Sequence, residues 1–560
     1  MESQSAEGTS AAEDWAAAET RSADLGDERL NRRLALVLRR LADQPEKSIP
    51  AASRGWGKTQ AAYRFFDNDK VTAEKVLAPH REATLQRAGQ HPVVLCVEDT
   101  SDLDYTSKTE TQGLGPLNYE ATRGINIHPM LAITPEGLCL GVLDFWRWVR
   151  DPSDHGGKDR QDRLSRPLEE KESLRWVEGY KKVDELQRQL GETRLVYVAD
   201  RDSDLFELFE AADQGQASWL IRAAQDRAVQ GGGLIWDKVG QSPSLGQVEF
   251  DLPPGRGRTP RRVVQSLRAA RVLLRAPYRP GKRLSAVEVT AILAREDNPP
   301  PGEQPIEWLL LSNLPVDSFE DAHEKVRWYL CRWQIEVFFR ILKSGCKVEQ
   351  LQLQTRERIE VALSLYLIVA WRVLYLTRLG RTVPDLSCEV AFSPQEWKAV
   401  YLVCKSQRPP STPPRLREIL TLVASLGGYL ARTGDGPPGP KTIWVGLQRT
   451  RDFVLALEAH DFGVDRGGID DLRARPWVGA ELTHVHEVHP GGIGAQGRLH
   501  AGQPVGQERH QNRLATLDAS ADERQDGGEQ VPGAVVEDGL MAKTSQLRAG
   551  HAAGQCTLPD

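Results

Sequence analysis

The stretch from Tyr329 to Lys343, YLCRWQIEVFFRILK, carries one acid among several cations at helical spacing. An ideal α-helix, at about 100° per residue, would place five of its side chains within one arc of roughly 80°. The five are Tyr329, Arg332, Glu336, Arg340 and Lys343. A solvated surface with i,i+4 ion pairs shows the same pattern, and such pairs contribute only about 0.3–0.5 kcal/mol each. Taken alone, the stretch therefore favours an ordinary surface over a catalytic face.

Two short apolar runs that end in an acid change this interpretation. VVLCVED ends at Asp99 and LVYVAD ends at Asp200, and each pattern predicts a buried strand with a carboxylate at its end. A buried carboxylate is costly to desolvate unless it is paired or bound to a metal ion. If the strands are neighbours, the two carboxylates lie side by side, and a divalent cation is the simplest way to keep both ionised. Glu336 then supplies a third oxygen ligand.

This set of carboxylates suits Mg²⁺, which keeps several waters and is held by few protein carboxylates together with substrate phosphates. Two such ions about 3.5–4 Å apart can activate a water and stabilise the leaving oxygen of a phosphoryl transfer. The cations around Glu336 would hold the phosphates of a nucleic acid strand, and Tyr329 would add a hydroxyl donor. The three acids and the basic face together predict a metal-dependent nuclease site.

The bulk composition is that of a globular protein with several domains. The chain has 560 residues, of which 40% are hydrophobic and 27% charged, with a net charge of −6. Its seven cysteines are scattered without a CxxC pair, which argues against a zinc module or a disulfide framework. No run approaches about 18 uninterrupted apolar residues, and the N-terminus lacks a secretory pattern. We therefore expect a cytoplasmic protein without a membrane partner.

Two regions are locally basic in spite of the net negative charge. Between Asp251 and Glu288 there are ten Lys or Arg residues and no acid. A solvated basic loop and a phosphate contact explain this block equally well. Residues 24–90 have helical periodicity, and Arg29, Arg32 and Arg33 flank their apolar stripe. Here too a DNA-binding face and a solvated surface are equally open.

The order of apolar runs predicts an α/β region followed by helices. Strand-like runs and one intervening helix occupy residues 91–350, with β-rich pieces at about 224–305. A long apolar helix and shorter helices with Pro-rich breaks follow, over residues 351–458. Residues 1–23 are acidic and rich in small residues, and we expect them to be disordered. Residues 459–560 have little periodicity, which predicts a tail that is disordered or translated in a shifted frame.

At this point the sequence resembles a known family. Tyr329, Arg332, Glu336 and Lys343 match the Y-(2)-R-(3)-E-(6)-K signature of the insertion-sequence-four family of bacterial DDE transposases, in particular its Tn-five type. Asp99 in VEDTSDLDY and Asp200 in VADRDSDLF resemble the first two acids of that family's triad. Further similar segments are LGDERLNRR, AAYRFFDN, KESLRW and LGGYLAR, so the resemblance covers about residues 14–458.

The resemblance implies an α/β fold: an RNase H-like core, in which helices flank a mixed sheet, with a β-rich insertion and helical N- and C-terminal domains. It assigns residues 24–90 to DNA-end binding, 91–350 to catalysis with the insertion at about 224–305, and 351–458 to dimerisation. Asp99, Asp200 and Glu336 are then the catalytic residues and the ligands of Mg²⁺, for which Mn²⁺ can substitute. The expected DNA-binding residues are Tyr329, Arg332, Arg340, Lys343, Trp308, Arg29, Arg32 and Arg33. Trp308 would help to hold a flipped base, although a core aromatic of a strand has the same sequence pattern.

The activity that the resemblance implies is cutting and joining of DNA at the ends of an insertion sequence. Water attacks a phosphodiester and frees a 3′-hydroxyl, which then attacks the opposite strand or target DNA. The partners would be double-stranded DNA, as terminal inverted repeats and target, and a second copy of the chain in a synaptic complex at the bacterial nucleoid. Two alternatives stay open: a catalytically impaired, transposase-derived DNA-binding regulator, and a metal-dependent nuclease without strand transfer. A glycosidase is disfavoured, because its carboxylates would need aromatic sugar platforms rather than a cationic helix face.

Overall fold

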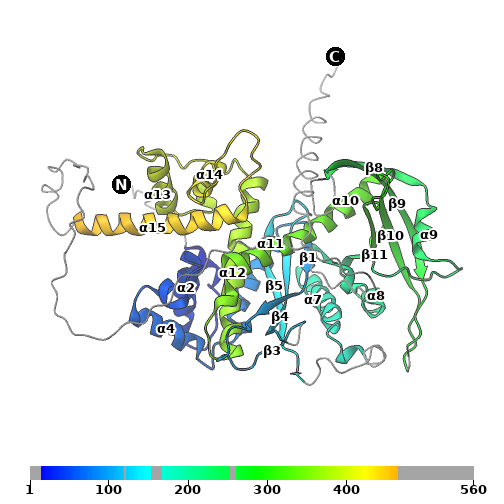
Figure 1. The fold of residues 1–560 in the computed structure, drawn as a ribbon, viewed down its shortest axis with the longest axis horizontal. Coiled ribbons are helices and arrows are strands. Elements are labelled where there is room, and N and C mark those ends of the chain that lie inside the picture. The colour runs from blue at the N-terminus through cyan, green and yellow to red at the C-terminus, as the bar shows by residue number, and fades with distance from the viewer. Residues whose placement is uncertain (1–13, 119–120, 153–166, 253–259, 280, 465–560) are drawn as a thin grey trace, which may run out of the picture. The chain divides into compact units, whose positions relative to one another are not determined.

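The computed structural model describes residues 14–118, 121–152, 167–252, 260–279 and 281–464 (Figure 1). The expectations for residues 1–13 and for the tail from 465 onward lie outside this part of the chain. The described residues form one mixed sheet of eleven strands with helices packed against it.

Five strands make the core of the sheet, in the spatial order β5-β4-β1-β6-β7. β4 pairs antiparallel with β1 and β5, whereas β1, β6 and β7 run parallel to one another. This mixed arrangement confirms the predicted RNase H-like core. The five strands are β1 (Val93–Glu98), β4 (Arg123–Ile133), β5 (Cys139–Trp148), β6 (Arg194–Ala199) and β7 (Ser218–Arg222).

Two short strands lie against β4. β2 (Ser101–Asp104) and β1 pair with the same edge of β4. β5 pairs with the opposite edge of β4, along the residues that β1 and β2 contact. β1 and β2 therefore lie end to end along this edge of β4, with a break at Asp99 and Thr100. β3 (Gly115–Pro116) pairs with the start of β4.

The β-rich insertion is confirmed, and it extends the same sheet instead of forming a separate layer. β11 pairs antiparallel with β7 of the core, and β10, β9 and β8 follow in antiparallel order (Figure 1). Along β8 every second residue from Val248 onward is buried, as expected for a strand with one face covered. The bounds are β8 (Ser244–Leu252), β9 (Arg261–Leu274), β10 (Val287–Glu296), β11 (Glu307–Ser312) and the adjacent helix α9 (Ile235–Gly240).

The core of the sheet buries both faces, which explains why β1, β6 and β7 are apolar at nearly every position. On β1, Leu95 and Val97 belong to one core cluster while Val94 and Cys96 belong to the other, since side chains alternate between faces. α7 (Leu174–Leu190) packs against β6 and α8 (Phe206–Asp213). On the other face lie α5 (Ala73–Ala88) and α12 (Arg356–Thr382), which both pack against β5.

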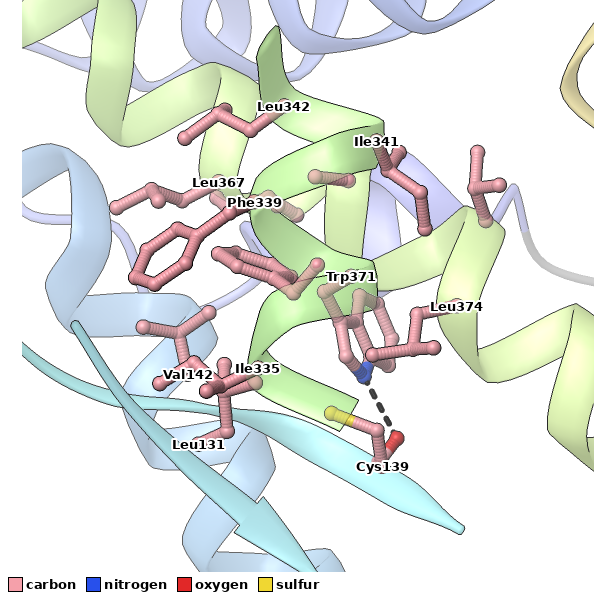
Figure 2. Packing of buried hydrophobic residues seen from close by; sticks show 14 of the residues in the cluster. Leu131, Cys139, Val142, Ile335, Phe339, Ile341, Leu342, Leu367, Trp371 and Leu374 are labelled. Carbon is pink, nitrogen blue, oxygen red and sulfur yellow. Dashed lines mark hydrogen bonds between the residues drawn. The ribbon is translucent and has the colours of Figure 1, made fainter. Parts of the chain in front are cut away.

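Helix α12 is the one described helix that is long and apolar enough to cross a membrane, and 94% of its most apolar window is buried inside the protein. Figure 2 shows Trp371 and Leu374 of this helix beside Ile335 and Phe339, above Val142 of the sheet. The Trp371 indole donates a 3.0 Å hydrogen bond to the Cys139 carbonyl oxygen. The apolar character of α12 is therefore explained by packing in the core.

The N-terminal and C-terminal regions are helical, as predicted. The first helix lies within the range expected to be disordered: α1 is capped by Asp14 and buries Ala16. Its Glu19 is buried and accepts hydrogen bonds from His80 and Arg87. The helices are α1 (Trp15–Glu19), α2 (Glu28–Asp43), α3 (Ile49–Ser53), α4 (Trp56–Phe66), α5 (Ala73–Ala88), α13 (Pro394–Lys405), α14 (Leu416–Leu426) and α15 (Pro440–Val464).

The stretch from Tyr329 to Lys343 is not the single regular helix that its spacing predicts. α10 (Phe319–Leu330) passes through a 3₁₀ turn at Cys331–Trp333 into α11 (Gln334–Arg340), and a π turn follows at Ile341–Gly345. These changes in residues per turn rotate successive side chains away from a common arc. Tyr329 and Arg332 are buried, whereas Glu336 and Arg340 are exposed.

Candidate active site

The two strand-end aspartates come together as their positions predict. β1 and β6 are adjacent and parallel, so Asp99 and Asp200, each one residue beyond its strand, lie at the same edge of the sheet. Each carboxylate is oriented by a backbone donor. Asp99 Oδ1 accepts a 2.7 Å hydrogen bond from the Thr100 N–H, and Asp200 Oδ1 accepts one of 2.9 Å from the Asp202 N–H.

Arg332 lies among all three expected catalytic acids. Its Nη1 is 2.7 Å from Asp99 Oδ2 and 3.5 Å from Glu336 Oε1. Burial by itself would lower the pKa of Arg332, but Tyr329 and the charges of Asp99, Asp200 and Glu336 raise that pKa. The guanidinium therefore stays protonated and supplies the positive charge at the centre of the acids.

The electrostatics show that one guanidinium does not fully neutralise the site. Burial raises the pKa of Asp99 to about 6, with Arg332 opposing this rise and Glu336 adding to it. Burial likewise raises the pKa of Asp200 to about 6, and the charges of Asp99 and Asp202 add to the rise. Both carboxyls therefore resist ionisation, as two close anions do when too little positive charge is present.

In this conformation no three His, Cys, Asp or Glu side chains among the described residues converge closely enough to hold a metal ion. At Asp99 and Glu336 the reason is visible, because Arg332 lies between their carboxylates. The residues nevertheless fit a divalent ion chemically: they are hard oxygen donors, and the pKa values of two of them are raised by burial and by neighbouring acids, which a bound cation would oppose. Asp99, Asp200 and Glu336 would be the residues that hold an ion of this kind.

The remaining residues of the signature differ in their surroundings. Tyr329 is buried, and its ring is tilted against that of Trp308 with 6.4 Å between ring centroids. Lys343 lies in the π turn, with its Nζ 3.4 Å from Asp102 Oδ1 and 4.0 Å from Glu349 Oε1. Arg340 is exposed and takes part in none of the ion pairs within the described residues. Of the signature residues, Arg332 forms ion pairs with both Asp99 and Glu336.

Several cations of the basic block between Asp251 and Glu288 form ion pairs with acids that lie outside the block. Arg261 pairs with Glu296 and Arg262 pairs with Glu249, both on neighbouring strands. Pairs at greater sequence distance join Arg271 to Asp317, Arg279 to Glu207 and Lys282 to Glu169. These contacts favour a solvated, ion-paired surface for this part of the block, while Arg256 and Arg258 lie outside the described residues.

The N-terminal arginines lie on the surface of α2. The side chains of Arg29 and Arg32 are 88% and 71% exposed and make only weak local pairs with Asp27 and Glu28. Arg33 lines a groove of about 220 Å³ between α2 and α4, together with Arg40 and Lys58. These cations are free to contact a polyanion.

Polar groups that the sequence pattern did not predict lie directly behind Asp99. These are Glu98, Thr100, His128 and Arg175, which lie in or beside the core. Two signals were available: the second acid in VVLCVED, and a histidine within the apolar run INIHPMLAIT. A polar residue inside an apolar strand needs a partner, and here His128 lies against both Glu98 and Thr100. Arg175, which donates to Thr100, comes from α7, far along the chain.

Comparisons with known proteins identify transposase domains along the chain. Residues 12–71 match a family model described as transposase DNA-binding, residues 178–372 match the transposase DDE domain, and residues 368–461 match the transposase Tn5 dimerisation domain. The DDE match includes Asp200 and Glu336, and Asp99 precedes its first residue. A cryo-EM structure of the piggyBac transposase synaptic complex with hairpin DNA shares 10% sequence identity, over 81% of this chain and 76% of that chain, with a TM-score of 0.31. A structural likeness this distant carries no argument about fold or function.

An RNase H-like sheet whose strand-end acids meet a helix acid, together with the DDE match, defines a DDE transposase, an enzyme that acts on DNA. The DNA-binding and dimerisation matches on either side narrow this class further. The chain belongs to the Tn5-like DDE transposases. A DDE domain implies a divalent metal ion, and the flanking domains imply DNA and a second copy of the protein as partners.

Proposed function

We propose that this transposase cuts DNA at the ends of an insertion sequence and joins the freed ends to target DNA, with Asp99, Asp200 and Glu336 as its catalytic residues. The observation that carries the proposal is the meeting of two strand-end aspartates and a helix glutamate around one guanidinium. Mg²⁺ fits this donor set best, and Mn²⁺ would substitute for it. When bound, the metal supplies an activated water and stabilises the leaving oxygen of an in-line displacement.

The protein side chains hold the acids and the DNA in place. Backbone donors fix one oxygen of Asp99 and one of Asp200. The other oxygen of Asp99 is held by Arg332, which would have to leave before that oxygen could bind a metal ion. Glu336, with its side chain 46% exposed, is the acid on the solvent side, from which DNA would approach. We infer that Arg332 moves from the carboxylates to a phosphate of the cut strand once the acids are neutralised.

The other expected DNA-binding residues would act along the strand. Arg340 and Lys343 would hold phosphates beyond Arg332, and Tyr329 would add its hydroxyl. The Trp308 ring, half-buried beside Tyr329, would stack on an extruded base. Arg29, Arg32 and Arg33 would bind the terminal inverted repeats through the exposed side of α2.

At the level of domains, we infer that the N-terminal helices to about residue 90 bind the DNA ends and that the helices of residues 351–458 pair two copies of the chain in a synaptic complex. The catalytic work would fall to residues 91–350. The expected setting is the nucleoid in a bacterial cytoplasm.

A strand-transfer assay separates this function from its nearest alternatives. Purified protein, Mg²⁺ and a DNA duplex carrying the inverted repeat that flanks the reading frame are mixed with a supercoiled target plasmid. The proposal predicts cleaved ends and, in addition, end DNA covalently joined to the plasmid. Cleavage without joined product would indicate a metal-dependent nuclease that does not transfer strands. Binding without any cleavage would indicate a catalytically impaired DNA-binding regulator.

A further inference from the structure

A chain of polar side chains lies directly behind Asp99, on the face of the sheet that α7 covers. Arg175 Nε donates a 3.0 Å hydrogen bond to Thr100 Oγ1, which in turn lies 2.9 Å from His128 Nδ1. On the far side of the ring, His128 Nε2 is 3.2 Å from Glu98 Oε2. Glu98, His128 and Arg175 are buried, so water does not compete for the hydrogen bonds that Thr100 makes with Arg175 and His128.

The Arg175 Nε–H can only donate, so Thr100 Oγ1 accepts there. The same hydroxyl keeps one proton and a second lone pair, so it can donate to His128 Nδ1 or accept from it, and this hydrogen bond forms with either tautomer of the ring. On the other side, His128 Nε2 and Glu98 Oε2 are in ion-pair range without a hydrogen bond between them. The hydroxyl of Thr100 is therefore held from two sides, by Arg175 and by His128.

Packing holds this chain of groups rigidly. The Arg175 guanidinium lies between the rings of Trp148 and Trp176, 5.0 and 5.3 Å from their centroids. The His128 ring meets Trp176 edge to face, with 4.5 Å between centroids. Gly179 of α7 leaves the space that Glu98 occupies, because a Cβ at this position would overlap the Glu98 carboxylate.

The anchored hydroxyl matters because the backbone of the same residue binds the catalytic acid. Thr100 N–H donates to Asp99 Oδ1, while Arg332 occupies Asp99 Oδ2. Thr100 lies in the break between β1 and β2, where no strand pairing with β4 fixes its backbone. Its side-chain hydrogen bonds to His128 and Arg175 therefore replace the missing strand pairing at this point.

We propose that Thr100, His128 and Arg175 are positioning residues, which hold the Thr100 backbone so that Asp99 keeps one oxygen fixed while the other exchanges Arg332 for a divalent metal ion. This inference rests on the proposed function, in which Asp99 is a metal ligand. Groups that orient metal ligands in this way typically change metal affinity by about 10–100-fold when they are removed.

The test compares Thr100→Val, which keeps the shape and removes the hydroxyl, with Thr100→Ser, which keeps the hydroxyl. Mn²⁺ binding is measured without DNA by EPR of the free ion, and cleavage of end DNA is measured as a function of Mg²⁺ concentration. Thermal melting and metal-free DNA binding report whether each variant is folded. We expect Thr100→Val to need roughly tenfold more Mn²⁺ for half-saturation and Thr100→Ser to stay within about twofold of the wild type.

Equal Mn²⁺ binding by the wild type and Thr100→Val would overturn the inference, and so would equal losses in Thr100→Val and Thr100→Ser. Failure of the wild type itself to bind Mn²⁺ would instead overturn the proposed function. If Thr100→Val does not fold, Arg175→Lys takes its place. It keeps a cation between the tryptophan rings but removes the Nε–H donor. The same rise in half-saturating Mn²⁺ is expected, and an unchanged value would contradict the proposal.

Discussion

At the scale of single residues, the site is defined by an imbalance of charge. Three acids meet near one buried guanidinium, and the pKa values of Asp99 and Asp200 are both raised to about 6, chiefly by burial. A carboxyl with a raised pKa in the folded chain binds more protons there than in the unfolded chain. Its contribution to stability is therefore lost as pH rises from about 4 to about 6 and is absent above that range.

Asp200→Asn should accordingly stabilise the protein when no divalent ion is present. The amide keeps the shape of the side chain and removes the repulsion from Asp99 and Asp202. In EDTA at pH 8 we expect a gain of about 1–2 kcal/mol in the free energy of unfolding, which shrinks toward zero at pH 4. Thermal melts followed by circular dichroism at both pH values measure it.

Asp69→Asn, on an exposed turn, is the matched control and should change the melting temperature little at either pH. A melting temperature for Asp200→Asn at or below that of the wild type at pH 8 would show that Arg332 already neutralises the site.

At the scale of elements, the sequence predicts the strands well because their signal is local. Apolar runs ending in an acid lie on adjacent parallel strands, so the meeting of Asp99 and Asp200 could be deduced once the strands were paired. Alternation between two buried faces is likewise readable along β1. These features depend on residues a few positions apart.

Other features depend on partners far away in the sequence and could not be predicted. The π turn at Ile341–Gly345 packs beneath Trp444 of α15, where a Cβ on Gly345 would come within 3.1 Å of the indole ring. The basic block of the insertion is compensated by acids such as Glu169 and Asp317, outside the block itself. Because these acids lie outside the block, the sequence of the block alone could not show whether its cations are already paired.

Helix α7 gives an element-scale prediction, because it approaches β1 so closely that only glycine fits at Gly179. In Gly179→Ala the new Cβ would overlap the Glu98 carboxylate and displace a buried charged group or the helix. We expect a loss of about 2–4 kcal/mol in the free energy of unfolding, measured by urea denaturation.

Gly57→Ala in α4 serves as the control, since nothing lies within 4 Å of a Cβ at that position. It should leave stability unchanged or raise it by up to about 1 kcal/mol. Similar effects of the two substitutions would mean that α7 can shift away from β1 without cost.

At the scale of the whole molecule, one sheet links the catalytic core to the insertion, and one buried helix links it to the C-terminal helices. β11 pairs with β7 directly, and α12 packs against β5, α2 and α14. The C-terminal region also exposes apolar side chains, including Val390, Leu402 and Val403 at 51%, 37% and 40%. The match to the Tn5 dimerisation domain covers these residues.

Leu402→Lys should therefore weaken pairing of two copies on DNA without unfolding the chain. A charge placed in a buried apolar contact is costly to desolvate, so we expect at least a tenfold lower yield of paired-end complexes on native gels. Single-end binding should persist. Leu234→Lys, at a leucine of similar exposure before α9, is the matched control. Equal yields for Leu402→Lys and the control would place the contact between copies elsewhere.

The central claim is that Asp99, Asp200 and Glu336 form one metal-dependent catalytic site, and Glu336→Gln tests it most directly. The exposed side chain of Glu336 makes a structural effect small, and glutamine keeps its size while removing the charge. The measurement is cleavage of end DNA in Mg²⁺, with DNA binding measured in parallel on the same preparation. The account predicts that cleavage falls by at least 10³-fold while binding stays within about threefold of the wild type. Cleavage that survives the substitution, or binding lost together with cleavage, would contradict the role given to Glu336 and with it the three-acid site.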